Sequence, residues 1–176
     1  MKYKIKFINQ FLKESLYKCC FFSILLFMYR ILFICHGNIC RSPMAEFVMK
    51  HLVAQAGRAH EFQIASAATS SEELGNDTHR GTRAKLDEMG VPYKKRAARK
   101  ITPADYDRYD LLIGMDDENI YYMHRIFGDD SAHKMHKLLE YCGLSRDVAD
   151  PWYTGDFDAT WNDVYAGCKS LLMALE

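Results

Sequence analysis

The stretch RILFICHGNICRSP, residues 30–43, decides the fold of this chain. Residues 30–34 form a short apolar run that predicts a buried strand. The small polar loop CHGNIC, residues 35–40, follows, and a helix is predicted over residues 43–55. Pro43 suits the first turn of that helix, because its missing N–H group would be unpaired there in any case. The stretch therefore predicts a strand, a tight loop and a helix in direct succession.

The loop between this strand and this helix has the features of an anion-binding site. Backbone N–H groups of a loop that enters a helix N-terminus converge on one point and attract an anion. Gly37 and Asn38 tolerate the positive φ that such a cradle demands, and Arg41 adds a planar guanidinium suited to phosphate oxygens. The same field stabilises a thiolate on Cys35, and Ser42 can donate its hydroxyl to the sulfur. The loop thus predicts a phosphate cradle with a nucleophile in its floor, suited to transfer of a phosphoryl group to sulfur.

Strands and helices alternate along the rest of the chain. The predicted strands cover residues 30–34, 62–66, 110–114 and 134–139. The predicted helices cover residues 43–55, a segment ending near Gly90, a segment from its cap Asp116 to about Phe127, and residues 159–175. This alternation is typical of right-handed βαβ units. The predicted fold class is therefore α/β, a doubly wound parallel sheet with helices on both faces.

The composition is that of one ordinary globular domain. The chain has 176 residues, 23 basic and 23 acidic side chains, and 49% hydrophobic residues. These values exclude a disordered or collagen-like chain, and the zero net charge gives no overall field that would hold nucleic acid. Six cysteines are too few and too unevenly spaced for a disulfide scaffold. We therefore expect a reduced, cytoplasmic protein, with secretion without a cleaved signal as the open alternative.

The first 28 residues differ from the rest of the chain. Residues 1–18 are rich in lysine, and residues 19–29 are an apolar run too short to span a bilayer. This order resembles a secretory signal, but no Ala-x-Ala-like cleavage site follows it. We expect residues 1–28 to have no structural role and residues 29–176 to form the domain, with Met28 as the biological start and residues 1–27 as an upstream extension. A membrane-surface anchor is the alternative, although we expect no membrane contact.

A second chemical signal follows the predicted fourth strand. Asp150 precedes Pro151, which stiffens the loop, and Trp152 and Tyr153 can wall a pocket. Attack on phosphorus needs an acid for the leaving oxygen, and Asp150 is the candidate. It would protonate a departing phenoxide and then deprotonate the water that hydrolyses the phosphocysteine. A simple Asp-Pro turn and an aromatic cover for the core are the structural alternatives.

The two signals together resemble a known family. The phrase FICHGNICRSPMAE, residues 33–46, followed far downstream by Asp150 and Pro151, is similar to the low-molecular-weight protein-tyrosine phosphatases, and the similarity covers residues 29–176. The resemblance implies a four-stranded sheet in the order 2-1-3-4 and hydrolysis of phosphotyrosine in protein substrates, with no metal and no other cofactor. It implies a nucleophile, Cys35, a phosphate and transition-state ligand, Arg41, and a proton donor, Asp150.

The resemblance also assigns roles to the remaining loop residues. The implied phosphate-binding set is His36, Gly37, Asn38, Ile39, Cys40, Arg41 and Ser42, and the implied substrate pocket includes Trp152 and Tyr153. Asn38 would fix the shape of the loop, and Ser42 would bond the thiolate. Cys40 would trap oxidised Cys35 in a reversible disulfide. Ile39 favours phosphotyrosine, because relatives that act on phosphoarginine tend to carry threonine there.

Two departures from the family pattern bear on this interpretation. Many relatives carry a histidine behind the phosphate loop, where this chain has Lys94, Lys95 and Arg96. The segment after the second strand, SSEE at residues 70–73, is polar, whereas relatives often offer an aromatic side chain there. If the basic run at residues 94–100 borders the pocket, it would favour acidic phosphoproteins.

Four functions are weighed against each other. The leading one is a phosphotyrosine phosphatase, acting as a monomer or a weak dimer. The alternatives are a protein-arginine phosphatase, an arsenate reductase on the same fold, and a non-catalytic phosphate-binding or redox module. An arsenate reductase needs further resolving cysteines that reach Cys35, and residues 41–141 contain none. Cys142 and Cys168 stand far apart in the sequence.

Overall fold

The computed structural model describes residues 28–176, and these residues form the α/β architecture that the alternation predicts. The interpretation of residues 1–27 as an upstream extension lies outside the described residues. Within the described part of the chain, no helix is both long and apolar enough to cross a membrane.

The centre of the molecule is a four-stranded parallel sheet. The strands are β1 (Tyr29–Cys35), β2 (Phe62–Ala68), β3 (Leu111–Gly114) and β4 (Met135–Lys137). They lie in the order β2-β1-β3-β4, which confirms the predicted order 2-1-3-4. All three strand pairs are parallel, so the carboxyl ends of the strands share one edge of the sheet.

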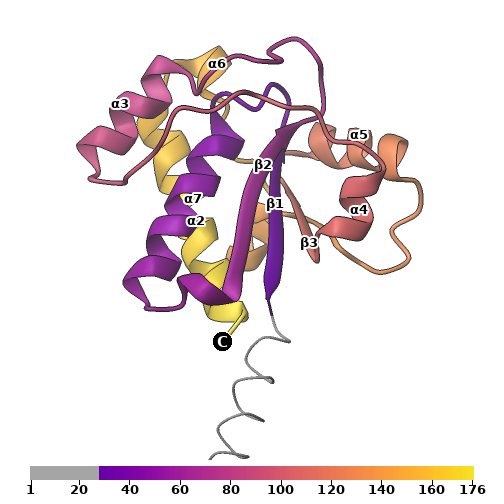
Figure 1. Cartoon of the computed structure of the whole chain (residues 1–176). Helices are drawn as coiled ribbons and strands as arrows, with labels where there is room; N and C mark the ends of the chain where they lie inside the picture. The colour runs from indigo at the N-terminus through magenta and orange to yellow at the C-terminus, as the bar shows by residue number, and fades with distance from the viewer. Residues whose placement is uncertain (1–27) are drawn as a thin grey trace, which may run out of the picture.

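Helices cover both faces of this sheet. They are α2 (Arg41–Gln55), α3 (Arg80–Glu88), α4 (Ala104–Arg108), α5 (Asp117–Phe127), α6 (Pro151–Thr154) and α7 (Phe157–Ala174), with 3-10 turns η1 (Ala59–Glu61) and η2 (Leu138–Cys142). Figure 1 shows α2 and α7 on one side of the sheet and α4 and α5 on the other. The doubly wound arrangement is therefore confirmed.

The central strand β1 explains why two layers of helices are needed. Its residues Ile31 and Phe33 belong to the core beneath α2 and α7, and Leu32 and Ile34 belong to the core on the α5 side. All four side chains are fully buried. Successive residues of a strand point to opposite faces, so a strand that is apolar throughout must be covered on both sides.

The fourth strand is shorter than residues 134–139, and this part of the prediction is wrong. β4 ends at Lys137, and Leu138 and Leu139 begin the 3-10 turn η2. Both leucines are buried in the same core. Neighbouring residues of a strand point to opposite faces, so a strand could not bury both leucines in one core. The 3-10 turn can direct both side chains into that core.

The other boundaries differ from the predictions by a few residues. The last helix starts at Phe157 rather than at residue 159, because the Asp156 side chain accepts a hydrogen bond from the Ala159 N–H group and caps it. The Asp116 cap of α5 is as predicted, since its carboxylate accepts from the Asn119 N–H group. The short helices α4 and α6 were not predicted, because helices of four or five residues have too few positions to show periodicity.

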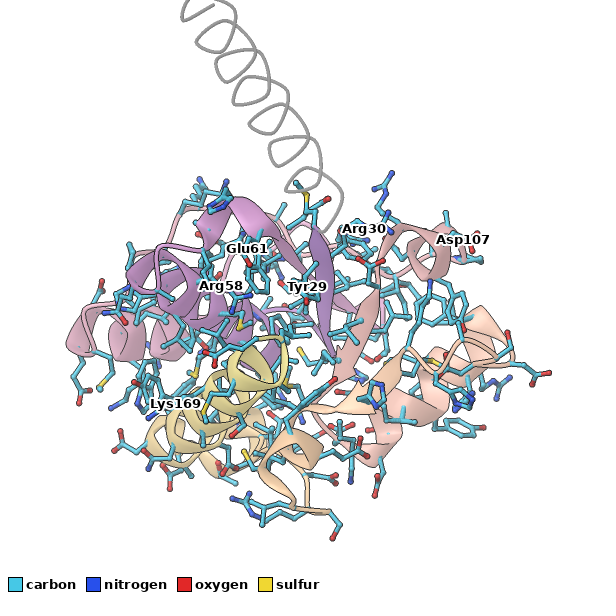
Figure 2. All side chains as sticks on the ribbon, turned by 90° about the horizontal axis from the view of Figure 1, so that it is seen from below. Tyr29, Arg30, Arg58, Glu61, Asp107 and Lys169 are labelled. Atoms are coloured by element: carbon cyan, nitrogen blue, oxygen red, sulfur yellow. The ribbon has the colours of Figure 1, made fainter. Side chains whose placement is uncertain are left out.

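The end of the sheet where β1 begins is closed by local contacts. Tyr29 stacks on Phe62 with ring centroids 5.2 Å apart, and Arg58 pairs with Glu61 at 2.7 Å. Figure 2 looks onto this end and labels Tyr29, Arg58 and Glu61 there. Cys35, the last residue of β1, therefore lies at the opposite end of the sheet.

Candidate active site

A pocket of about 380 Å³ opens at the carboxyl ends of the strands. It is lined by residues 35–37 and 39–41, by Glu72, Glu73, Asp116 and Glu118, and by residues 147–150, 152 and 153. Loops after β1, β2 and β3 contribute, as does the segment that leads into α6. Open α/β sheets place their ligand sites at this edge.

The floor of the pocket is the loop between β1 and α2. The Sγ atom of Cys35 lies 3.0 Å from the Ser42 Oγ atom and accepts a hydrogen bond of 3.3 Å from the Asn38 N–H group. Cys35 is buried, with 2% of its surface exposed. The Ser42 hydroxyl and the Asn38 N–H group both lie within hydrogen-bond reach of this sulfur. The predicted contact between Ser42 and Cys35 is thus present.

Asn38 is the residue that shapes this loop. Its φ is 57°, in the left-handed region, where asparagine is tolerated better than most residues. Its Nδ2 atom donates to the Ser42 Oγ atom at 2.8 Å and to the Ser66 Oγ atom at 2.9 Å. Ser66 donates in turn to Glu46 at 2.6 Å. Asn38 and Ser42 are fully buried and lie behind the pocket floor rather than lining it.

Arg96 supports Asn38 from behind the loop. Its guanidinium donates to the Asn38 carbonyl oxygen at 2.8 Å and to the Asn38 Oδ1 atom at 2.6 Å. Its Nε atom lies 3.9 Å from a Glu46 carboxylate oxygen. Burial lowers the pKa of Arg96, although the charges of Glu46 and Cys35 oppose this. A guanidinium therefore occupies the place behind the loop where relatives were expected to carry histidine.

The guanidinium of Arg41 is held between two carboxylates. Its Nη1 atom donates to Asp116 at 2.5 Å, and its Nη2 atom lies 2.5 Å from Asp150. Burial acts to lower the pKa of Arg41. The charges of Cys35, Asp116 and Asp150 outweigh burial, so the pKa of Arg41 is raised. The pocket thus brings together three residues that the sequence singled out for chemistry, Cys35, Arg41 and Asp150.

Asp116 was predicted only as a helix cap, and it also reaches the site. One oxygen accepts from the Asn119 N–H group at 2.6 Å, and the other accepts from Arg41. It follows β3 by two residues, so its position past the carboxyl end of a parallel strand was the available signal.

Cys40 also lines the pocket, next to Arg41 in the chain. Burial raises the pKa of Cys40 to about 12, and the charges of Cys35 and Asp150 add to this. Its predicted role as a partner of oxidised Cys35 stays a prediction. Cys142 and Cys168 are outside the lining that the described residues form.

The mouth of the pocket is aromatic on one side and acidic around much of the rest. Trp152 and Tyr153 line it and are 60% and 86% exposed, so they do not serve as core cover. His36 lines it as well, with its Nε2 atom 3.1 Å from Glu72.

The basic run at residues 94–100 does not line the pocket that the described residues enclose. Arg96 turns to Asn38, and Arg99 pairs with Asp105 at 3.0 Å. The condition for a preference toward acidic phosphoproteins is therefore not met. Among residues 28–176, no three histidine, cysteine or acidic side chains are grouped as ligands for one metal ion.

Comparison with known proteins places this geometry among phosphatases. Residues 30–176 match the profile of a family described as "Low molecular weight phosphotyrosine protein phosphatase". The chain is 36% identical over 151 residues to the low molecular weight protein-tyrosine-phosphatase YfkJ of Bacillus subtilis, covering 85% of this chain and 97% of that protein. The crystal structure of YfkJ matches with a TM-score of 0.81 over 84% of this chain and 94% of that chain.

Two further solved structures are similar. One is SP-PTP, a low molecular weight protein tyrosine phosphatase from Streptococcus pyogenes, at 38% identity and a TM-score of 0.75, covering 85% of this chain and 94% of that chain. The other is DARP, described as a drosophila arginine phosphatase, at 25% identity and a TM-score of 0.75, covering 83% of this chain and 97% of that chain.

Proposed function

We propose a function from one premise: this chain belongs to the low-molecular-weight phosphotyrosine protein phosphatase family. It is a phosphoric monoester hydrolase whose substrates are phosphoproteins. Our proposal is that it removes phosphate from tyrosine in two steps, through a phosphocysteine on Cys35. The observation that carries the proposal is the sulfur of Cys35, 3.0 Å from the Ser42 hydroxyl, in one pocket with Arg41 and Asp150.

In the first step the thiolate of Cys35 attacks phosphorus. The N–H groups of the loop and the guanidinium of Arg41 hold the phosphate oxygens, and they stabilise the charge that develops on them. The bond between phosphorus and the tyrosine oxygen breaks as the bond between sulfur and phosphorus forms. Asp150 gives its proton to the leaving oxygen, so that a neutral tyrosine departs.

In the second step the phosphocysteine is hydrolysed. Asp150, now ionised, takes a proton from a water molecule, and the resulting hydroxide attacks phosphorus. The bond between phosphorus and sulfur breaks, which releases inorganic phosphate and restores the thiolate. The hydroxyl of Ser42 supports the departing sulfur through the contact described above. In this proposal the side chains named above provide every group that the two steps use.

Hydrolysis of p-nitrophenyl phosphate and of a phosphotyrosine peptide, without added metal, tests this proposal. Cys35→Ser and Arg41→Ala should abolish turnover while leaving the fold intact. Cys142→Ser is the matched control, because Cys142 is a half-buried thiol outside the pocket lining. Full activity in Cys35→Ser would overturn the nucleophile assignment.

The rival functions separate in the same assays. A phosphoarginine peptide offered beside the phosphotyrosine peptide distinguishes the protein-arginine phosphatase, the activity named for the drosophila structure. Ile39 lines the pocket and favours phosphotyrosine in our proposal. An arsenate reductase would oxidise added thiol when arsenate is supplied. A non-catalytic module would bind phosphate tightly without releasing it from an ester.

The charges at the mouth of the pocket point to substrates with basic flanking residues. Glu73 and Glu118 line the mouth, and Glu118 is exposed. A phosphotyrosine that reaches Cys35 must bring its neighbouring residues past this rim. Opposite charges attract a substrate and like charges repel it, so lysine and arginine beside the phosphotyrosine should favour binding.

A further inference from the structure

His79 lies between the two loops that carry the proposed chemistry, although it is not among the residues that line the pocket. It is the N-cap of α3, and its Nδ1 atom accepts a hydrogen bond of 3.1 Å from the Gly81 N–H group. An Nδ1 atom that accepts must be unprotonated, so the ring carries its proton on the other nitrogen. Burial lowers the pKa of His79, and the charges of Arg80 and Arg83 lower it further.

The ring of His79 contacts two aromatic side chains that follow Asp150 in the chain. It stacks on Phe157, with ring centroids 5.5 Å apart and an interplanar angle of 3°. It meets Trp152 edge-on, with centroids 6.2 Å apart and an angle of 73°. Trp152 stands two residues after Asp150, and Phe157 opens α7. The chain between these contacts is the short helix α6 and its turn at Gly155.

The main chain of His79 is bonded to the phosphate loop. Its N–H group donates to the carbonyl oxygen of Ile39 at 2.8 Å. One turn later, the Thr82 hydroxyl donates to the carbonyl oxygen of Cys40 at 3.4 Å. One residue therefore contacts the phosphate loop through its backbone and the Asp150 segment through its ring.

The neighbouring residues keep this contact close. A Cβ atom at Gly81 would overlap the Phe157 ring, so only glycine lets α3 approach α7 at this point. Lys85 on α3 forms an ion pair with Asp158 on α7. In contrast, α6 is largely exposed, with Trp152 and Tyr153 at 60% and 86% exposure.

We propose that His79 is a positioning residue, whose ring holds the Asp150 segment against the phosphate loop at the distance that proton transfer requires. The inference rests on the proposed role of Asp150 as the proton donor. General acid catalysis requires the carboxyl group within hydrogen-bond reach of the leaving oxygen. Asp150 is paired with Arg41, and Ala149 before it is bonded to α7. The helix α6 after it has few buried contacts, and the His79 ring adds one through Trp152 while stacking on Phe157.

Two substitutions at His79 separate its ring from its capping role. His79→Asn keeps a side chain that caps helices well but removes the stacking ring. His79→Phe keeps a ring that can stack but removes the Nδ1 acceptor. The measurement is kcat/KM for p-nitrophenyl phosphate and for phenyl phosphate, because the phenyl ester depends far more on a proton for its leaving oxygen.

In His79→Asn the preference for p-nitrophenyl phosphate should rise by about tenfold, a fraction of what a general acid is worth. His79→Phe should keep the wild-type preference even where its melting temperature falls. Inhibition by vanadate should be unchanged in both variants, because the phosphate loop stays intact. An unchanged preference in His79→Asn, or equal shifts in the two variants, would overturn the proposal, and so would a loss of vanadate binding.

Asp150→Asn, measured alongside, separates this inference from the proposed function. If Asp150→Asn raises the preference for p-nitrophenyl phosphate and His79→Asn does not, the role of His79 is wrong and that of Asp150 stands. If Asp150→Asn leaves the preference unchanged, the general-acid assignment fails and the role of His79 fails with it.

Discussion

Replacing Arg96 by methionine should damage both the stability of the protein and its phosphate loop. The guanidinium donates two hydrogen bonds to Asn38, whose side chain and backbone are fully buried. Methionine removes both donors. Asn38 then keeps its strained φ of 57° with two fewer bonds to hold it.

The expected loss follows from the number and type of these bonds. Hydrogen bonds to a charged group are worth about 1.5–3 kcal/mol each, so two give at least about 3 kcal/mol. Removing a buried cation also relieves its desolvation, which offsets part of the larger values. We therefore expect Arg96→Met to lower the free energy of unfolding by about 3 kcal/mol and the melting temperature by about 10 °C.

Urea and thermal unfolding measure the stability of the variant. The value of kcat/KM for p-nitrophenyl phosphate measures whether the phosphate loop keeps its conformation. Loop amides displaced by about 1 Å should reduce kcat/KM by about a hundredfold. Arg96→Lys keeps the charge without the two-pronged contact and should fall between wild type and Arg96→Met. Lys95→Met is the control, because Lys95 is exposed and next in the chain. If Arg96→Met has the same melting temperature and the same kcat/KM as Lys95→Met, the reasoning is refuted.

Three other perturbations have expected outcomes. Peroxide should inactivate the enzyme reversibly, and Cys40→Ser should lose the recovery with thiol if Cys40 traps oxidised Cys35 as a disulfide; recovery at the wild-type rate would count against it. Burial acts to raise the pKa of Asp105, but hydrogen bonds from its partners outweigh burial and lower it. Its stabilisation is therefore present above the unfolded value of about 3.9 and is lost as the pH falls through the lower folded value. Urea unfolding should show Asp105→Asn well below wild type at pH 7 and close to it at about pH 2, whereas Asp107→Asn should match wild type throughout. Phosphotyrosine peptides with basic flanks should show a KM about threefold below that of acidic ones at low salt. Glu118→Gln should reduce the difference in KM between the basic and the acidic peptides. If KM does not depend on the charge of the flanking residues, the acidic rim does not determine which substrates bind.

The main elements of the fold could be predicted because their patterns depend on short segments. The apolar run of β1 predicts a buried strand by itself, and the residues of the loop after it predict an anion-binding turn. The start of α5 could be predicted because its cap needs only one carboxylate directly before the helix. The two leucines after Lys137 carry no such signal. An apolar pair suits a strand or a tight turn equally, and only the position of α7 decides between them.

The sequence pointed to Cys35, Arg41 and Asp150, which the structure brings into one pocket, but not to Asp116 as a member or to the pairings between side chains. Parallel strands end at one edge, which brings Cys35, Asp116 and Asp150 near each other. The direction of a long side chain such as Arg41 depends on the conformation of the whole loop, so its two carboxylate partners could not be read from spacing. The same applies to Arg96, which reaches Asn38 across 58 residues of sequence.

The two carboxylates beside Arg41 differ in how they are held, and this difference explains a division of labour. Asp116 is tied to Asn119 as the cap of α5, so it stays with the guanidinium. Asp150 is also a helix cap, accepting from the Trp152 N–H group at 3.0 Å, but its helix α6 has only four residues and is largely exposed. A phosphate dianion that enters the cradle competes for Arg41 with whichever carboxylate yields more easily, and that is Asp150. We infer that an entering phosphate displaces Asp150 from Arg41, while Asp116 keeps Arg41 in place.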